Sequence, residues 1–170
     1  MFESIYLYLR SIFILNNMKN NNPHGSVNYR KIDLTVVYLA NLINILIAFL
    51  FLARMSGLTE VENTLGISVI TMGFALGYIA YFNKKNRRDK WDTYLLIPIF
   101  LFMIIELILD YIFILDFRNT IIAGPYALLY YIGACGLIGY SFRFEKNWGL
   151  ITLGTYFIMM ILSIYPYVVN

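Results

Sequence analysis

Five long apolar stretches, separated by short polar ones, dominate the pattern of this chain. A helix needs about 20 apolar residues to cross the hydrocarbon layer of a membrane. The stretches that reach or approach this length cover residues 34–53, 65–82, 93–115, 121–142 and 148–169. Leu, Ile and Phe occupy every side of them, whereas the strands of a membrane barrel alternate apolar with polar positions. The pattern therefore predicts an all-α integral membrane protein, a bundle of five transmembrane helices.

Residues 1–17 follow a different pattern. Their apolar part is too short to span a membrane and is interrupted by Glu3 and Arg10. Polar residues recur there every seven positions, which places them on one helical face with the apolar residues opposite. The segment is therefore expected to be an interfacial amphipathic helix, or else a non-native extension before a translation start at Met18. Residues 18–170 are predicted to form one five-span domain, because the loops between the spans are short.

The composition supports a membrane location and excludes a soluble domain. Hydrophobic residues make up 60% of the chain and charged residues 14%, against roughly 25% charged residues in soluble domains. A soluble chain of this size could not bury so much apolar surface, so membrane lipid is the expected partner that covers it. The net charge of +3 is too small to indicate a nucleic-acid partner.

The basic residues are distributed unevenly, and their distribution predicts the orientation. In a five-span arrangement, eleven of the thirteen Lys and Arg residues fall on one side, and only Arg54 and Arg118 fall on the other. Because cytoplasmic loops are enriched in Lys and Arg, we expect a cytoplasmic N-terminus and an outside C-terminus, in the plasma membrane. The loop at residues 83–92 holds five of the basic residues and could bind anionic lipid or an acidic partner. The topology alone accounts for its charge, and that is the favoured interpretation.

Two carboxylates lie inside a predicted span: Glu106 and Asp110, four residues apart on one face of the third helix. An ionisable side chain at such depth costs at least ~2.5–3.5 kcal/mol on insertion scales, so both should face the bundle interior or water and have a partner. Side chains of three other helices lie at comparable depth when each helix is counted from its own end. They are Asn44, Tyr130 and Ser163. These five residues are the candidates for binding an ion or a solute.

A structural ion pair is the competing explanation for the two carboxylates. Arg54 follows the first span, and Asp116 and Arg118 follow the third, all at the predicted outer face. Asp110 is expected to belong to that outer cluster. Glu106 lies about one helical turn deeper, so its burial is harder to explain by pairing with the same arginines.

Small and polar residues at helical spacing indicate which faces turn inward. Asn41 and Asn44 form such a stripe on the first span. Thr152 and Thr155 form another on the fifth span. Glycines share a face on the second and fourth spans, where they allow helix backbones to approach closely. These glycines are Gly66, Gly73, Gly77, Gly133 and Gly136.

The sequence offers little for catalysis or metal binding. Its single cysteine, Cys135, and its single histidine, His24, cannot supply a disulfide, a CxxC pair or a thiolate cage, and neither haem nor zinc is expected. No HExxH or GxSxG motif is present, so no catalytic residue, metal ligand or cofactor is predicted. An enzymatic role is therefore the least favoured.

These observations favour a component that binds or moves a small cation, a proton or a polar solute through a polar interior around Glu106. The alternative is a structural or accessory subunit of a larger membrane complex, in which the charged and glycine faces serve helix packing. A membrane-embedded enzyme is the third hypothesis. Assembly as a homo-oligomer or within a larger complex is left open.

Overall fold

The computed structural model describes residues 29–115 and 120–169, and every regular element within these ranges is a helix. The elements are α2 (Tyr29–Met55), α3 (Thr59–Lys85), α4 (Lys90–Tyr94), α5 (Ile97–Glu106), the π-helix η1 (Leu107–Ile112), α6 (Ala123–Phe144) and α7 (Lys146–Val169). Residues 1–31 form a separate unit, of which only the first turn of α2 is described. The predicted amphipathic segment 1–17 lies outside the described residues.

Five helical stretches in the described part of the chain are long and apolar enough to cross a membrane. They cover Tyr29–Met55, Thr59–Lys85, Lys90–Ile112, Gly124–Phe144 and Lys146–Ile164. This confirms the predicted all-helical class with five candidate spans, as in a multi-pass membrane protein. α2 and α3 run beyond the predicted apolar stretches, because a helix can continue into the polar zone at either end of a span.

The third span is not the single α-helix that the pattern predicted. α4 ends at Tyr94, and α5 begins at Ile97 with Pro98 in its first turn. Proline has no N–H to donate to the preceding turn and its ring crowds that turn, so it separates the two helices. Beyond Glu106 the chain continues as the π-helix η1 instead of an α-helix.

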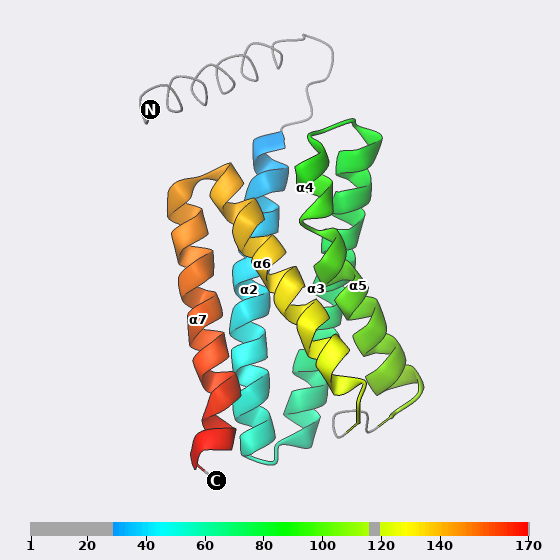
Figure 1. The fold of residues 1–170 in the computed structure, drawn as a ribbon, viewed down its shortest axis with the longest axis vertical. Coiled ribbons are helices and arrows are strands. Elements are labelled where there is room, and N and C mark those ends of the chain that lie inside the picture. Colours follow the sequence, from blue (N-terminus) through cyan, green and yellow to red (C-terminus); the bar gives the residue numbers. More distant parts are fainter. Residues whose placement is uncertain (1–28, 116–119, 170) are drawn as a thin grey trace. The chain divides into compact units, whose positions relative to one another are not determined.

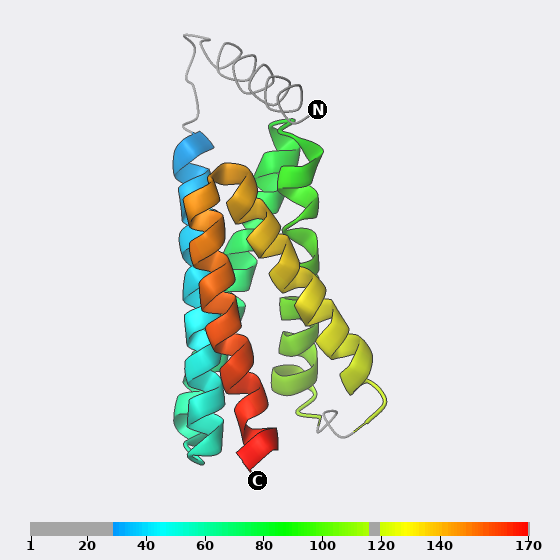
Figure 2. The ribbon, with the colours of Figure 1, turned by 60° about the vertical axis from the view of Figure 1, so that its left-hand side comes forward.

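Residues 32–170 form one compact unit in which successive spans run in opposite directions (Figure 1 and Figure 2). α6 packs against α5 and α7, and α3 packs against α4 and α5. α2 is joined to α7 by side-chain hydrogen bonds. We call the end that holds the α3–α4 turn the Arg88 end, and the end that holds η1 the Glu106 end.

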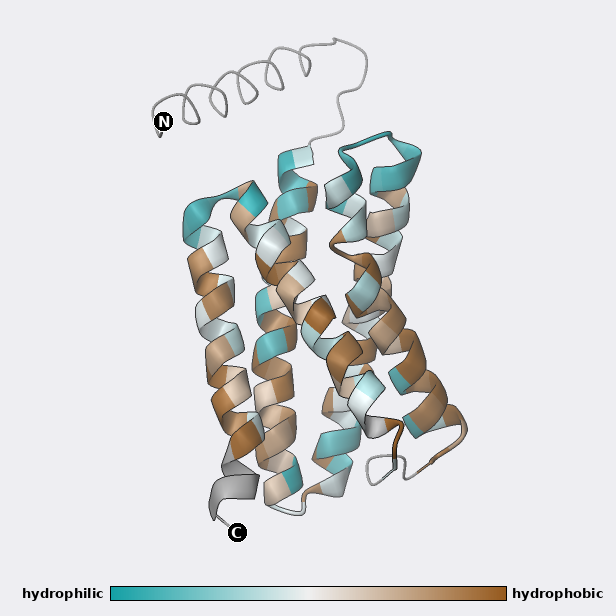
Figure 3. Cartoon of the chain, viewed as in Figure 1, coloured by the Kyte–Doolittle hydropathy of each residue, from teal (hydrophilic) through white to brown (hydrophobic). Residues whose placement is uncertain are grey.

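The interior of this unit is filled by apolar side chains from every span. Its largest fully buried apolar members are Ile43, Leu76, Leu96, Ile99, Met103, Leu137 and Met159. Many other large apolar side chains face outward, for example Phe49 at 55% and Ile161 at 62% exposure. Figure 3 shows hydrophilic residues gathered at the two ends of the unit, with mainly apolar residues between them. Such a surface suits a covering of lipid.

Two glycines of α6 allow this helix to lie directly against the chain around α5. A Cβ atom added to Gly133 would come within 2.8 Å of the Cα atom of Ile99. One added to Gly136 would collide with the carbonyl oxygen of Leu95. Side chains of α5 and η1 likewise cover the α3 glycines Gly66, Gly73 and Gly77. The predicted packing role of these glycines is confirmed.

Candidate functional site

A cleft opens at the Glu106 end, lined by α2, α3, α5, η1 and the residues that follow η1. Its volume is about 580 Å³. The polar residues that line it are Arg54, Glu62, Asn63, Glu106, Asp110 and Tyr111, and the others are aliphatic. Three carboxylates and one guanidinium among them give the lining a net negative charge.

Glu106, the last residue of α5, lies between α6 and the cleft. The hydroxyl group of Tyr126 on α6 donates a hydrogen bond to Oε2 of Glu106. The Tyr126 ring packs in turn on Phe102, with ring centroids 4.9 Å apart. The carboxylate is half-buried, so α6 holds it while the residue still contributes to the cleft wall. A hydroxyl donor orients a carboxylate without removing its charge.

The π-helix forms the wall of the cleft that carries Asp110 and Tyr111. It begins directly after Glu106, and its wider turns are a rare conformation that recurs at functional sites. Tyr111 packs across Gly66 of α3, and its hydroxyl donates to the carbonyl oxygen of Asn63 at 3.4 Å. The two predicted carboxylates therefore line one cleft, although the backbone between them is π-helical.

Arg54, in the last turn of α2, forms an ion pair with a residue that the sequence pattern had not indicated. Its Nη2 and Nε atoms lie 2.6 Å and 2.8 Å from Oε1 of Glu62 on α3. Both side chains are partly exposed, at 39% and 25%. Asp116 and Arg118, the other candidates for structural ion pairing, lie outside the described residues.

The three residues predicted to lie at the depth of Glu106 bond elsewhere. Nδ2 of Asn44 donates to Oγ1 of Thr155 on α7 at 3.0 Å. The Tyr130 hydroxyl donates to a methionine sulfur of α7 at 3.3 Å, and the Ser163 hydroxyl donates to a backbone carbonyl of its own helix at 2.7 Å. Counting along a helix gives the height of a residue but not the direction in which its face turns.

The polar stripes predicted on the first and fifth spans form a hydrogen-bonded layer between α2 and α7. Asn41 donates to Oγ1 of Thr152 at 3.0 Å and accepts from the Thr155 hydroxyl at 2.9 Å. The Thr152 hydroxyl extends the layer to the Ser141 hydroxyl of α6, 3.0 Å away. No buried side-chain polar atom in the described part of the chain lacks a partner. This layer therefore fastens helices together and offers no free group to a solute.

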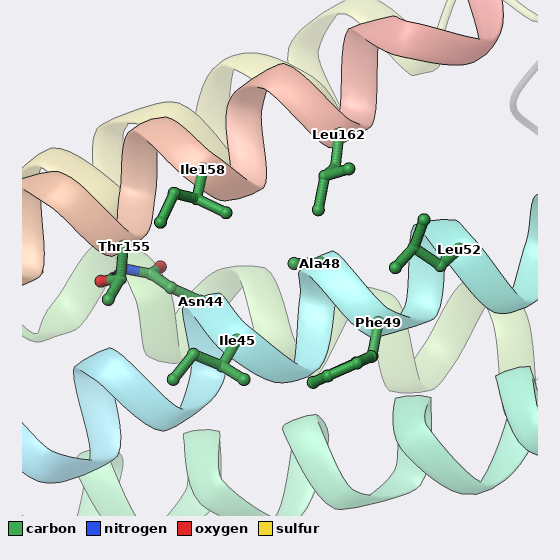
Figure 4. A pocket seen from close by; sticks show the side chains of 8 residues that line it. All are labelled: Asn44, Ile45, Ala48, Phe49, Leu52, Thr155, Ile158 and Leu162. Atoms are coloured by element: carbon green, nitrogen blue, oxygen red, sulfur yellow. Dashed lines mark hydrogen bonds between the residues drawn. The ribbon is translucent and has the colours of Figure 1, made fainter.

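A smaller cavity of about 250 Å³ lies beside this layer, between α2 and α7. Figure 4 shows Asn44 and Thr155 close together at one end of it. The remaining lining residues are apolar: Ile45, Ala48, Phe49, Leu52, Ile158 and Leu162. Because its polar groups bond to each other, this cavity is an apolar groove and not a site for a charged solute.

At the Arg88 end, ion pairs and a hydrogen bond join α2, α4 and α6 around one arginine. The guanidinium of Arg88 lies 2.8 Å from Oδ1 of Asp33 on α2 and 3.1 Å from Oδ2 of Asp92 on α4. The Tyr140 hydroxyl of α6 donates to the same Asp33 oxygen at 2.6 Å. Burial disfavours the charge of Arg88, but the hydrogen bond and charge of Asp33 outweigh it and raise the pKa of Arg88.

A second arginine adds an exposed layer to this network. Nη2 of Arg143 on α6 lies 3.0 Å from Asp89 and 3.4 Å from Asp92. The backbone N–H of Trp91 donates to Asp89 and lowers the pKa of its carboxyl. Partial burial opposes this shift, and the hydrogen bond and charge of Arg143 reinforce it.

This network was not predicted from the sequence, because all five basic residues of the loop 83–92 were explained by the membrane topology. The positions of two aspartates in the sequence could have indicated the network. Asp33 and Asp92 lie at the starts of two spans on the side where Arg88 also lies, and opposite charges at adjacent span ends attract.

Comparisons of the chain with family models, with curated proteins and with solved structures found no match.

Proposed function

We propose that this multi-pass membrane protein binds a small, positively charged organic solute in the cleft at the Glu106 end. The observation that carries the proposal is the lining of the cleft, where three carboxylates face a single guanidinium. The volume of about 580 Å³ falls within the range of small-molecule sites, roughly 300–1,000 Å³. Opposite charge attracts a cation to such a cleft and holds it there.

The spacing of the carboxylates favours an organic ammonium compound over a metal ion. Within the described residues, no three His, Cys, Asp or Glu side chains are grouped to hold a metal. Glu106, oriented by Tyr126, offers a carboxylate to an ammonium N–H, and such charge-assisted hydrogen bonds are strong. The ring of Tyr111 and the aliphatic part of the lining suit the carbon part of the solute.

Binding is supported better than movement of the solute across the membrane. Passage of a solute or a proton would need a second opening at the Arg88 end. There, Arg88 joins α2 to α4 through Asp33 and Asp92, and the Tyr140 hydroxyl of α6 donates a hydrogen bond to Asp33. A cleft open at one end and an ion-paired opposite end support a binding component.

A structural or accessory role in a larger membrane complex is the second candidate. The bond from Tyr126 to Glu106 and the ion pair of Arg54 with Glu62 each join two helices. In this case the carboxylates of the cleft stabilise the bundle, and the cleft takes no solute.

We also propose that the Arg88 end faces the cytoplasm, so that the cleft opens on the outer face of the plasma membrane. The support is the placement of eleven of the thirteen Lys and Arg residues on one side of the five spans. A cysteine introduced as Asn86→Cys, in a Cys135→Ser background, tests this orientation. It should not react with a membrane-impermeant maleimide applied to intact cells, and reaction from outside would overturn the proposal.

Ligand binding to the purified protein tests the solute site. Methylammonium, tetramethylammonium and spermidine are titrated in detergent, with glucose as the uncharged control, and thermal unfolding is followed. A ligand at 100 times its Kd should stabilise the folded state by about 2.7 kcal/mol. Glu106→Gln keeps the size of the side chain but removes its charge, and should weaken ammonium binding about tenfold.

The matched control is Glu145→Gln, which makes the same change at an exposed residue between α6 and α7. This variant should bind the ammonium compounds as the parent does. If none of the ammonium compounds stabilises the parent protein, the proposed site is refuted. A Glu106→Gln variant with lower thermal stability but unchanged affinity would support the structural role instead.

A further inference from the structure

Two adjacent arginines in the α3–α4 turn take opposite directions. Arg87 has a φ angle of +53°, the left-handed region that L residues seldom adopt. The backbone N–H of Arg88 bonds to the carbonyl oxygen of Asn83 at 3.0 Å, which closes the end of α3. The chain reverses at this point, so the Arg88 side chain is largely buried against Asp33 while Arg87 is exposed.

This reversal separates the charges at the Arg88 end. The acidic side chains Asp33 and Asp92 are turned to Arg88, and Asp89 is turned to Arg143. The other basic side chains at the α3–α4 turn are all exposed, and none of them forms an ion pair or a hydrogen bond within the described part of the chain. They are Lys84, Lys85, Arg87 and Lys90, and we call these four residues the basic turn.

Exposed aromatic rings flank the basic turn along the chain. Trp91 and Tyr94 are 58% and 55% exposed, and their ring centroids lie 6.4 Å apart in an edge-to-face arrangement. Tyr81, near the end of α3, is 61% exposed. Trp and Tyr at the ends of membrane spans sit at the level of the lipid headgroups. The basic turn is therefore expected at the height of the headgroup phosphates.

We propose that the basic turn binds the headgroups of anionic phospholipids in the adjacent leaflet. Four positive charges without internal partners attract a surface of negative charge. The aromatic rings keep the turn at the membrane interface, which favours a lipid over a soluble acidic protein. This function is independent of the solute cleft, because it uses residues at the opposite end of the bundle.

The tryptophans of the chain provide the assay. There are two, Trp91 beside the basic turn and Trp148 in the first turn of α7. In a Trp148→Phe variant, Trp91 is the only tryptophan and reports which lipids lie next to it. The protein is reconstituted in phosphatidylcholine vesicles with about 10 mol% of a brominated lipid, whose bromine atoms quench tryptophan on contact. The brominated lipid is either phosphatidylglycerol, which is anionic, or phosphatidylcholine, which is zwitterionic.

Brominated phosphatidylglycerol should quench Trp91 about twice as strongly as brominated phosphatidylcholine at the same mole fraction. Replacing all four residues of the basic turn with Gln should abolish the difference, and Lys84→Gln with Lys85→Gln should reduce it by about half. Raising the salt concentration to about 0.5 M should also reduce it, because the contact is electrostatic. In a Trp91→Phe variant, the remaining Trp148 serves as the control and should show a smaller preference.

Equal quenching by the two brominated lipids in the Trp148→Phe protein would overturn the proposal. So would a preference for the anionic lipid that keeps its full size in the fourfold Gln variant. Inorganic phosphate separates a lipid site from a general phosphate site. If phosphate removes the preference at an ionic strength where sodium chloride does not, the assignment to lipid is wrong.

Discussion

Replacing Arg88 with Met should destabilise the protein more than removing any exposed charge at the same end. The guanidinium lies 2.8 Å from Asp33 and 3.1 Å from Asp92, and it donates to Oδ1 of Asn83 at 3.1 Å. Methionine occupies much of the volume of the arginine stem but carries no charge. The variant therefore removes the cation that lies between Asp33 and Asp92, and only Asp92 keeps another one, Arg143 at 3.4 Å.

The size of the effect follows from burial. The side chains of Arg88, Asp33 and Asp92 are only 14%, 16% and 15% exposed. Removing one partner of a buried ion pair costs about 3–5 kcal/mol, and the residual exposure favours the lower value. For a chain of this length, 1 kcal/mol shifts Tm by about 2–4 °C, so we expect Tm to fall by about 6–12 °C.

Thermal unfolding in detergent at neutral pH measures the shift, and Arg143→Met is the matched control. Arg143 makes a similar pair with Asp89 at 3.0 Å, but the two side chains are 41% and 52% exposed, and its contact with Asp92 is longer, at 3.4 Å. An exposed pair contributes about 0–1 kcal/mol, so the control should lose less than about 4 °C. Combining Arg88→Met with Asp33→Asn should restore part of the loss, because one stranded carboxylate is removed.

Two results would refute this reasoning. The first is an Arg88→Met variant that loses no more stability than Arg143→Met, which would mean that water screens both pairs equally. The second is strict additivity of Arg88→Met and Asp33→Asn, since residues in direct contact should show a coupling energy of about 0.5–3 kcal/mol.

Three further predictions use the same unfolding measurement. Gly133→Ala should lower stability by about 1–3 kcal/mol because the new Cβ atom meets the α5 backbone. Gly154→Ala, in open space, should be neutral or stabilise the protein by up to about 1 kcal/mol. Equal effects of the two variants on stability would contradict the packing argument. Folding lowers the pKa of Asp89, so its contribution to stability is present above the ordinary pKa of 3.8 and is lost as the pH falls below that value through the folded pKa. Asp89→Asn should therefore lose less stability than the parent on acidification below about pH 4, and an unchanged profile would count against the shift. Asn44→Leu removes a 3.0 Å bond to Thr155 and should cost about 0.6–1.7 kcal/mol; a more stable variant would show that this bond does not hold α2 to α7.

Several features of the molecule are visible in the sequence because they depend on local pattern. A span is a continuous apolar run, and its length and composition can be counted without knowing what lies beside it. A carboxylate at depth in such a run must find water or a partner, which is why Glu106 and Asp110 were expected at a polar site and both line the cleft. The glycine face of α6 was visible for the same reason, since Gly133 and Gly136 repeat at helical spacing.

The partners of these residues depend on tertiary structure. The height of Asn44 on its helix could be counted, but the rotation of α2 turns it to Thr155 and away from Glu106. The hydroxyl that Glu106 accepts from belongs to Tyr126, four residues from the tyrosine expected by depth. Rotation about a helix axis is decided by the packing of all its neighbours together, and no single stretch of sequence carries that information.

The α3–α4 turn shows most clearly which features the sequence determines and which the tertiary structure determines. From the sequence, Arg87 and Arg88 are two equivalent charges that together predict which side of the membrane the loop occupies. In the folded chain, one left-handed residue exposes Arg87 and places Arg88 between Asp33 and Asp92. Charge and hydropathy belong to each residue alone and survive in any conformation. Which of two neighbouring arginines is buried depends on a backbone reversal and on carboxylates from other helices, so only the tertiary structure decides it.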